Sequence, residues 1–251
     1  MSQTFSGKPK ILSLAASEKE ANVAISAGQK VLQSVGFNDW LEQFPDPQAI
    51  GRSSALVSMV KQALQMADVP VGSLDAIALT HGPGRFTGLR VAVVTARMLC
   101  YAWDLPVVAI NSLYVSAAKL QRERSLGPGE KIWAITDAQR RQVFASQFET
   151  QPDGNLKSIV DQGLFDREEI LERLEPRQHV TGSGAFAFGK QIESKTQIAL
   201  PDVEIATCDA IGVAAVAQAR VEVGDFDDPM KVDPIYFRPS AAEEVRLAKQ
   251  G

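Results

Sequence analysis

Histidine and cysteine are scarce in this sequence, which has two of each among 251 residues. His81 and His179 are far apart and form no H-E-x-x-H or H-x-x-x-H pair, so a helical pair of metal-binding imidazoles is absent. Cys100 lies in an apolar helical run and Cys208 beside a helix start, which predicts buried thiols in a reducing compartment. No G-x-S-x-G nucleophile motif occurs. The sequence therefore predicts no catalytic and no metal-binding residue in this chain.

Long apolar runs and dense positive charge are also lacking. No run approaches the ~20 apolar residues that span a bilayer, and residues 1–10 are polar, without the apolar centre of a secretory signal. The formal net charge is -4, a poor match for a phosphate backbone. Since 45% of the residues are hydrophobic, a full core is available. We expect a soluble, cytoplasmic protein that binds nucleic acid weakly by itself.

Hydrophobic periodicity predicts two successive units with the same order of elements. Strands of the first unit are expected at 10–14, 22–27, 30–35, 74–80 and 106–110. Its helices are expected at 53–67, 88–103 and 112–124, after a turn-rich stretch at 37–47. Strands of the second unit are expected at 131–136, 142–149, 156–160 and 179–181, with helices at 167–174 and 185–192.

Three strands followed by helix, strand and helix, occurring twice, indicate an α/β fold with two mixed sheets. Two such units with a cleft between them suit the duplicated, ribonuclease-H-like fold of the actin and Hsp70 ATPases. A simple doubly wound sheet is the alternative. The expected subdomains are 1–125 and 126–251, and a last helix at about 208–223 is a candidate to pack back on the first subdomain.

In the ATPases of that fold, backbone amides after the first strand of each half hold phosphate, and a carboxylate organises the metal. The first turn here, Ala15-Ala16-Ser17-Glu18, has no acid at the strand end, and alanine cannot bind Mg²⁺. Asp137 in the second turn suits a metal ligand or a turn carboxylate about equally. Gly182-Ser183-Gly184 suits a phosphate loop or, more often, a plain loop. The cofactor-binding residues of this chain are therefore left unknown.

The most informative segment runs from His81 to Arg90 and joins a strand to a helix. Gly82 and Gly84 permit unusual backbone angles, Pro83 stiffens the turn, and Thr87 is placed to cap the helix. The segment is neither the G-x-G-x-x-G fingerprint nor a P-loop. From physics alone it is a shaped strand-to-helix loop.

This segment resembles the G-P-G-S-F-T-G-L-R signature of the bacterial TsaB family, once called YeaZ, and departs from it only at Arg85. Residues 136–144 resemble the family's second-half turn and strand, and residues 234–239 its closing P-x-Y-L-R segment. The matches cover nearly the whole chain. Ala15-Ala16 departs from the usual Asp-Thr, which weakens any nucleotide binding by this chain alone.

The resemblance implies an actin-like fold with a reduced second subdomain and a complex with the proteins TsaD and TsaE. That complex transfers threonylcarbamoyl to the tRNA adenosine beside the anticodon. The active site, the metal and the ATP are expected on the partners, so this chain is expected to be a non-catalytic scaffold. The alternatives are a homodimeric interaction module without a tRNA role, a metallopeptidase and a kinase; the missing histidine pair and the missing acid argue against the last two.

The resemblance also implies that the helices at 53–67 and 88–103 contact TsaD, or a second copy in a homodimer. The second helix is apolar beyond its core stripe, and an exposed apolar patch of that kind marks an interface. The expected interface residues are Gly88, Val91, Val94, Thr95, Met98 and Ala102. The loop expected to shape the interface consists of Gly82, Pro83, Gly84, Phe86 and Thr87.

Overall fold

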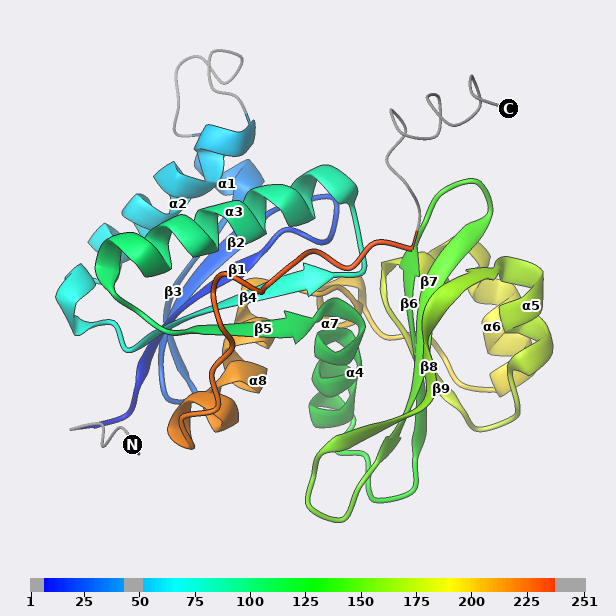
Figure 1. Ribbon diagram of the computed structural model, residues 1–251. Helices are drawn as coiled ribbons and strands as arrows, with labels where there is room; N and C mark the ends of the chain where they lie inside the picture. The colour runs from blue at the N-terminus through cyan, green and yellow to red at the C-terminus, as the bar shows by residue number, and fades with distance from the viewer. Residues whose placement is uncertain (1–6, 43–51, 238–251) are drawn as a thin grey trace.

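The computed structural model describes residues 7–42 and 52–237, which form two mixed sheets side by side (Figure 1). Residues 1–6, the turn expected around Pro45–Pro47 and the closing Arg238-Pro239 lie outside the described residues. The first sheet contains, in spatial order, β3 (Lys30–Gly36), β2 (Asn22–Ala27), β1 (Lys10–Ala15), β4 (Ala76–Gly82) and β5 (Val107–Asn111). β1, β2 and β3 pair antiparallel, whereas β4 is parallel to both β1 and β5.

The second sheet repeats this arrangement with one strand fewer. Its spatial order is β8 (Leu156–Asp166), β7 (Gln142–Thr150), β6 (Lys131–Asp137) and β9 (His179–Thr181). β6, β7 and β8 pair antiparallel, and β9 is parallel to β6. The predicted α/β fold with two related mixed sheets, the second reduced, is therefore confirmed.

The helices also follow the predicted order. They are α1 (Phe37–Leu41), α2 (Arg52–Met66), α3 (Phe86–Trp103), α4 (Ser112–Glu123), α5 (Arg167–Arg173), α6 (Gly189–Thr196), α7 (Val203–Ala206) and α8 (Ala210–Glu222). Two 3₁₀ segments, η2 (Val71–Ser73) and η3 (Ser183–Phe188), complete the set. In the part of the chain that the structure describes, no helix has both the length and the apolar character to cross a membrane.

Three local expectations were wrong. The stretch at 37–47 begins with α1 rather than with a turn, because Trp40 is buried and packs on Phe37. The strand expected at 156–160 extends to Asp166, which pairs with Gln142 of β7. Ser183 begins η3, so the expected loop at 182–184 is already the start of a helical turn.

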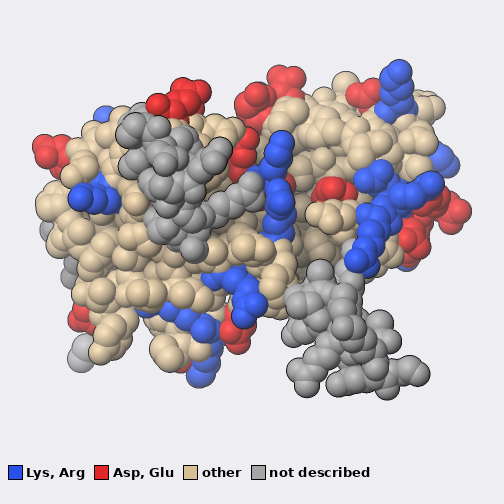
Figure 2. Space-filling model, turned by 90° about the horizontal axis from the view of Figure 1, so that it is seen from above, with Lys and Arg blue, Asp and Glu red and all other residues tan. Residues whose placement is uncertain are grey.

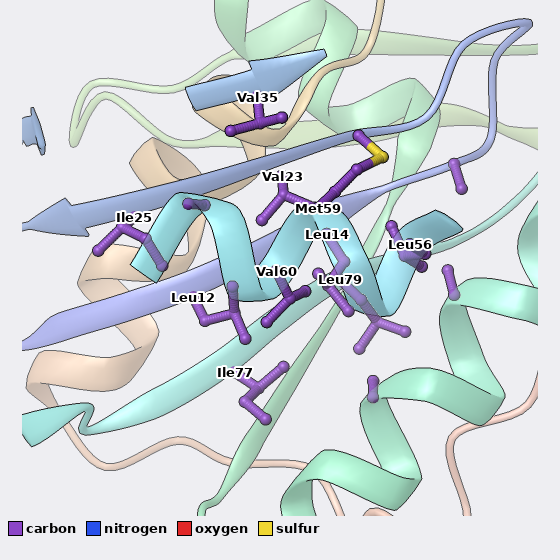
Figure 3. Close-up of a cluster of buried hydrophobic side chains, with 14 of the residues drawn as sticks. Leu12, Leu14, Val23, Ile25, Val35, Leu56, Met59, Val60, Ile77 and Leu79 are labelled. Atoms are coloured by element: carbon purple, nitrogen blue, oxygen red, sulfur yellow. The ribbon is translucent and has the colours of Figure 1, made fainter. Parts of the chain in front are cut away.

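The main core lies between the first sheet and helices α2 and α3 (Figure 3). Alternate strand residues point to this face, because side chains along a strand alternate between the two faces of a sheet. They include Leu12, Leu14, Val23, Ile25, Ile77 and Leu79, which pack on Leu56, Met59 and Val60 of α2. The amphipathic pattern of the sequence therefore places α2 and α3 together on one face, with their other sides toward solvent.

Helices α4 and α8 cover the opposite face of the first sheet. α8 contacts β1, β2, β4 and β5 although it follows the second sheet in the sequence. α4 contacts β6 and β7 as well as β4 and β5, so it lies between the two sheets. The Lys119 ammonium of α4 donates to Glu204 O, to Thr207 O and to the carboxylate of Asp209, which fixes the start of α8.

Candidate partner-binding face and interdomain cleft

The loop between β4 and α3 is held by parts of the chain that are distant in sequence. Gly82 has a φ of 125°, which favours glycine, and a Cβ there would lie 3.0 Å from Ile235 O. Ile235 N donates to His81 O at 2.7 Å. On the other side, the buried Ser112 hydroxyl donates to Pro83 O. The loop conformation is therefore set by contacts with the C-terminal segment and with α4.

The start of α3 crosses directly over the turn that follows β1. A Cβ on Gly84 would lie 2.4 Å from Ser17 O, and Arg85 N donates to that oxygen at 2.8 Å. A Cβ on Gly88 would lie only 2.0 Å from Ala16 O. Gly88, expected to admit a partner helix, therefore faces the backbone of its own chain instead.

Two further expectations about α3 need correction. The helix begins at Phe86 rather than near Gly88, so Thr87 lies inside its first turn, and no side chain caps the helix. Thr95, expected in the interface, is only 6% exposed. It lies one turn before Leu99, which lines the groove against α2, so this row of α3 faces the neighbouring helix.

The outer sides of α2 and α3 form an exposed apolar surface, here called the α2–α3 face. Its large side chains are Val57 of α2, 50% exposed, and Val94, Met98 and Tyr101 of α3, which are 53%, 66% and 92% exposed. Ala102 is also exposed and Val91 is half-buried. Figure 2 views the molecule from above, and much of the surface on the side of the first subdomain carries no charge. An apolar surface of this kind is typical of a protein-binding face.

A groove of 530 Å³ deepens this face where α2 and α3 lie side by side. Val57 and Leu64 of α2 line it together with Leu99 and Trp103 of α3. Lys61 contributes a charged group to the same lining. The groove offers space for apolar side chains of a partner helix.

The turn after β1 meets Asp137, Ser183 and Cys208 between the two sheets, in a buried region here called the cleft. It contains a carboxyl group that sequence reasoning missed. Glu18, three residues after β1, places Oε1 in a fully buried position without a hydrogen-bond partner among the described residues. Burial raises the pKa of Glu18 above its ordinary value of 4.5, and the nearby Asp137 carboxylate raises it further. The Ser183 hydroxyl opposite and the Cys208 backbone N–H favour the charged form but do not cancel this shift. The sequence signal is the acid at the end of the turn Ala15-Ala16-Ser17-Glu18, three residues beyond the strand end.

Asp137 acts as the carboxylate of its turn. Its Oδ1 accepts from Gln139 N at 3.2 Å and pairs with Arg167 at 3.3 Å. The side chain is 47% exposed, and no group of three or more His, Cys, Asp or Glu residues within the described ranges is arranged to hold a metal. Of the two roles that the sequence left open, the turn role is the one that these contacts favour.

The glycines at 182 and 184 face the chain's own backbone rather than an open cradle. A Cβ on Gly182, where φ is 100°, would lie 2.2 Å from Ile135 O. A Cβ on Gly184 would lie 2.8 Å from Asp137 N. These glycines allow η3 to pack closely on β6, which favours a structural role for this segment over phosphate binding.

The histidines and cysteines are separate and buried to different degrees. His81 Nδ1 lies 3.1 Å from Asp233 O, and burial lowers the pKa of His81. His179 lies beside Arg124 and Glu130, and burial likewise lowers its pKa. Both cysteines are free and buried, and desolvation raises the pKa of Cys100 to about 11 and also raises the pKa of Cys208. Thiols with raised pKa values are unreactive.

Two mixed sheets of related strand order, side by side, define the class of proteins that share the actin-like ATPase fold. The family model described as tRNA N6-adenosine threonylcarbamoyltransferase (TsaD) matches residues 45–223, and the chain belongs to this family.

The resemblance to TsaB is confirmed by individual relatives. The TsaB protein of Haemophilus influenzae is 27% identical over 73% of this chain and 78% of its own length. That of Escherichia coli is 21% identical over 74% of this chain and 80% of its own length. The solved structure of YeaZ from Pseudomonas aeruginosa has a TM-score of 0.70 at 23% identity, covering 91% of this chain and 99% of that one, and shows the shared fold.

The residues of the cleft do not fit the nucleotide that ATPases of this fold hold there. A phosphate group needs free backbone amides and space at glycines. Here Gly84 and Gly182 face the carbonyl oxygens of Ser17 and Ile135 at close range. Glu18 also brings a carboxyl group into the same cleft, where its negative form would repel a phosphate.

Proposed function

We propose that this chain is a non-catalytic subunit that binds the TsaD protein and supports threonylcarbamoyl transfer to the tRNA adenosine beside the anticodon. Membership of the TsaD family and the TsaB relatives support the pathway. The closed cleft supports a role without nucleotide turnover in this chain. ATP and a metal ion are then expected on TsaD and TsaE, and tRNA is expected to bind to the whole complex.

The observation that carries this proposal is the exposed α2–α3 face. Val94 and Met98 are more than half exposed although they are large apolar side chains, and they lie on the longest helix of the described residues. Burying such side chains is favourable by roughly 25 cal/mol per Å² of apolar surface. A partner that covers the face would therefore gain stability from side chains that the monomer leaves in water.

Binding to the TsaD protein of the same organism tests the proposal directly. Val94→Glu should abolish co-purification, because it places a charge in the contact, while the monomer remains folded. Val203→Glu is the matched control, since Val203 on α7 is 53% exposed, as Val94 is. If Val94→Glu binds TsaD with the wild-type affinity, the proposed face is wrong. Loss of the modified nucleoside from tRNA after depletion of this protein tests the pathway separately.

A further inference from the structure

A C-terminal strap, residues 225–237, runs back from α8 across the first subdomain (Figure 1). It first covers the edge strand β5, where Asp227 N donates to Val107 O at 2.9 Å. The Asp227 carboxylate accepts from Ala109 N at 2.7 Å. These bonds satisfy backbone groups that an edge strand otherwise leaves open.

The strap is then held against α3 by Arg97. Its guanidinium donates to Pro229 O at 3.0 Å, to Val232 O at 2.6 Å and to Asp233 Oδ1 at 2.8 Å. Arg97 is thus fully engaged within the chain. The strap therefore lies along the outer side of α3, and the two segments form the two sides of a groove.

A groove of 330 Å³ lies between the strap and α3. Phe86 and Tyr236 line it with stacked rings whose centroids are 4.5 Å apart. Val94 lines it from the α3 side and Asp233 from the strap side. Because Val94 also belongs to the α2–α3 face, the groove is continuous with that face.

Arg90 supplies the groove with a cation that no acid of the described residues neutralises. Its guanidinium carbon lies 5.2 Å from the centroid of the Phe86 ring, and the side chain is exposed. No acidic side chain within residues 7–42 and 52–237 pairs with it, in contrast to Arg97. A guanidinium held on an aromatic ring loses little further freedom when it binds a planar anion.

We propose that this groove receives a carboxylate side chain from the TsaD helix that packs on the α2–α3 face, with Arg90 as its binding partner. The inference rests on the proposed function and deepens it. Guanidinium and carboxylate form bidentate pairs, which define register as well as affinity. A nucleic-acid backbone suits the groove less well, because Val93, Val94 and the stacked rings make most of its lining apolar.

A second copy of this chain is also a poorer match than an acidic partner. Helices α2 and α3 contain Lys and Arg but neither Asp nor Glu. A symmetric contact between two α2–α3 faces would therefore bring no carboxylate from these helices to Arg90. The acids at the rim of the face are Asp68, beyond the end of α2, and Asp233, which is already paired with Arg97. The acid that meets Arg90 is therefore expected from a different surface.

Calorimetric titration of the full chain with the TsaD protein of the same organism tests the role of Arg90. Arg90→Glu should weaken binding by about thirtyfold or more, since an unpaired buried charge would remain on the partner. The affinity of Arg90→Lys should lie between those of the wild type and Arg90→Glu. Lysine keeps the positive charge but lacks the planar guanidinium that forms bidentate pairs. The salt dependence of binding should be kept in Arg90→Lys and lost in Arg90→Glu. Lys157→Glu changes the charge equally on exposed β8 and should bind as the wild type does.

The outcomes separate this inference from the proposed function. If Arg90→Glu binds normally while Val94→Glu does not, the groove is not a carboxylate site but the face stands. If Arg90→Glu abolishes self-association and leaves TsaD binding unchanged, the occupant is a second copy and the proposal is overturned. If reversing the charge of one acidic residue on the TsaD helix restores binding to Arg90→Glu, that residue is identified as the partner of Arg90.

Discussion

The ring of Phe86, the first residue of α3, stacks on the ring of Tyr236, with centroids 4.5 Å apart and planes inclined by 26°. Phe86 belongs to the strand-to-helix signature and Tyr236 to the closing motif. The two segments that carry much of the family resemblance are therefore in contact, although the sequence separates them widely. This contact ties the C-terminal strap to the start of the helix that carries the α2–α3 face.

Replacing either ring should weaken the same contact. We expect Tyr236→Ala and Phe86→Ala each to lower the free energy of unfolding by about 1 kcal/mol or more, the usual worth of an aromatic pair with its burial. The double variant should cost less than the sum, because both changes remove one interaction. Urea denaturation of all four proteins measures this, and strictly additive losses would show that the stacking contributes nothing.

Arg97 should hold the strap through its hydrogen bonds rather than through its charge. Arg97→Gln is expected to cost about 2 kcal/mol in unfolding free energy and to speed proteolysis of the strap. Arg97→Lys should recover only part of this, since an ammonium lacks the planar fork. Arg173→Gln is the control, because Arg173 and Glu169 form an exposed helical pair worth roughly 0.5 kcal/mol or less. Equal effects of Arg97→Gln and Arg173→Gln would refute the strap role.

Gly88→Ala should destabilise the chain strongly. The new methyl group would lie 2.0 Å from Ala16 O, and a backbone carbonyl cannot move aside as a flexible side chain would. We expect a loss of about 3 kcal/mol, at the upper end of the usual range for overpacking. Gly72→Ala serves as control, because nothing lies within 4 Å of its added Cβ. Thermal melting measures this loss of stability. A wild-type melting temperature for Gly88→Ala would contradict the close crossing of α3 over the turn after β1.

The buried Glu18 predicts a specific pH dependence of stability. Its pKa in the folded chain is raised above 4.5, so between 4.5 and the raised value the folded state binds more protons than the unfolded state. Stability therefore falls as the pH rises through this window. Glu18→Gln removes the titrating group. The free energy of unfolding of this variant, relative to that of the wild type, should therefore be lowest below pH 4.5 and should increase with rising pH.

Denaturation at several pH values measures this difference. Asp137→Asn is a useful companion variant, because the Asp137 carboxylate raises the pKa of Glu18 only through its charge. This variant should therefore reduce the pH dependence without removing Glu18. A constant difference between Glu18→Gln and the wild type across the whole pH range would show that Glu18 ionises freely and that the cleft is open to water.

Local sequence patterns were sufficient for most of the architecture. The buried run of β1, the alternation of Val23 and Ile25 in β2 and the apolar stripe of α3 at Leu89, Val93 and Ala96 predicted these elements. The stripe also predicted the side that α3 buries. Such patterns are local, because a strand or helix shows its buried face through the spacing of its own residues. The order of the elements then indicated the duplicated fold.

The candidate site was only partly predictable for a related reason. Val94 and Met98 were recognised because they lie off the core stripe of their own helix. Thr95 and Gly88 were misplaced because their surroundings come from α2 and from the turn after β1. Spacing along one helix says which residues share a side, but it does not say which neighbouring element covers that side.

The sequence by itself determined the two mixed sheets, the course of α2 and α3 and the family, since these depend on local periodicity and on contiguous motifs. Only the tertiary structure decided that the Glu18 carboxyl group is buried in the cleft, that Arg97 is engaged by the strap and that Arg90 lies over the Phe86 ring without an acidic partner among the described residues. Each of these depends on contacts between segments far apart in the chain. Burial and pairing of a charged side chain are properties of such contacts, and no spacing along the sequence records them.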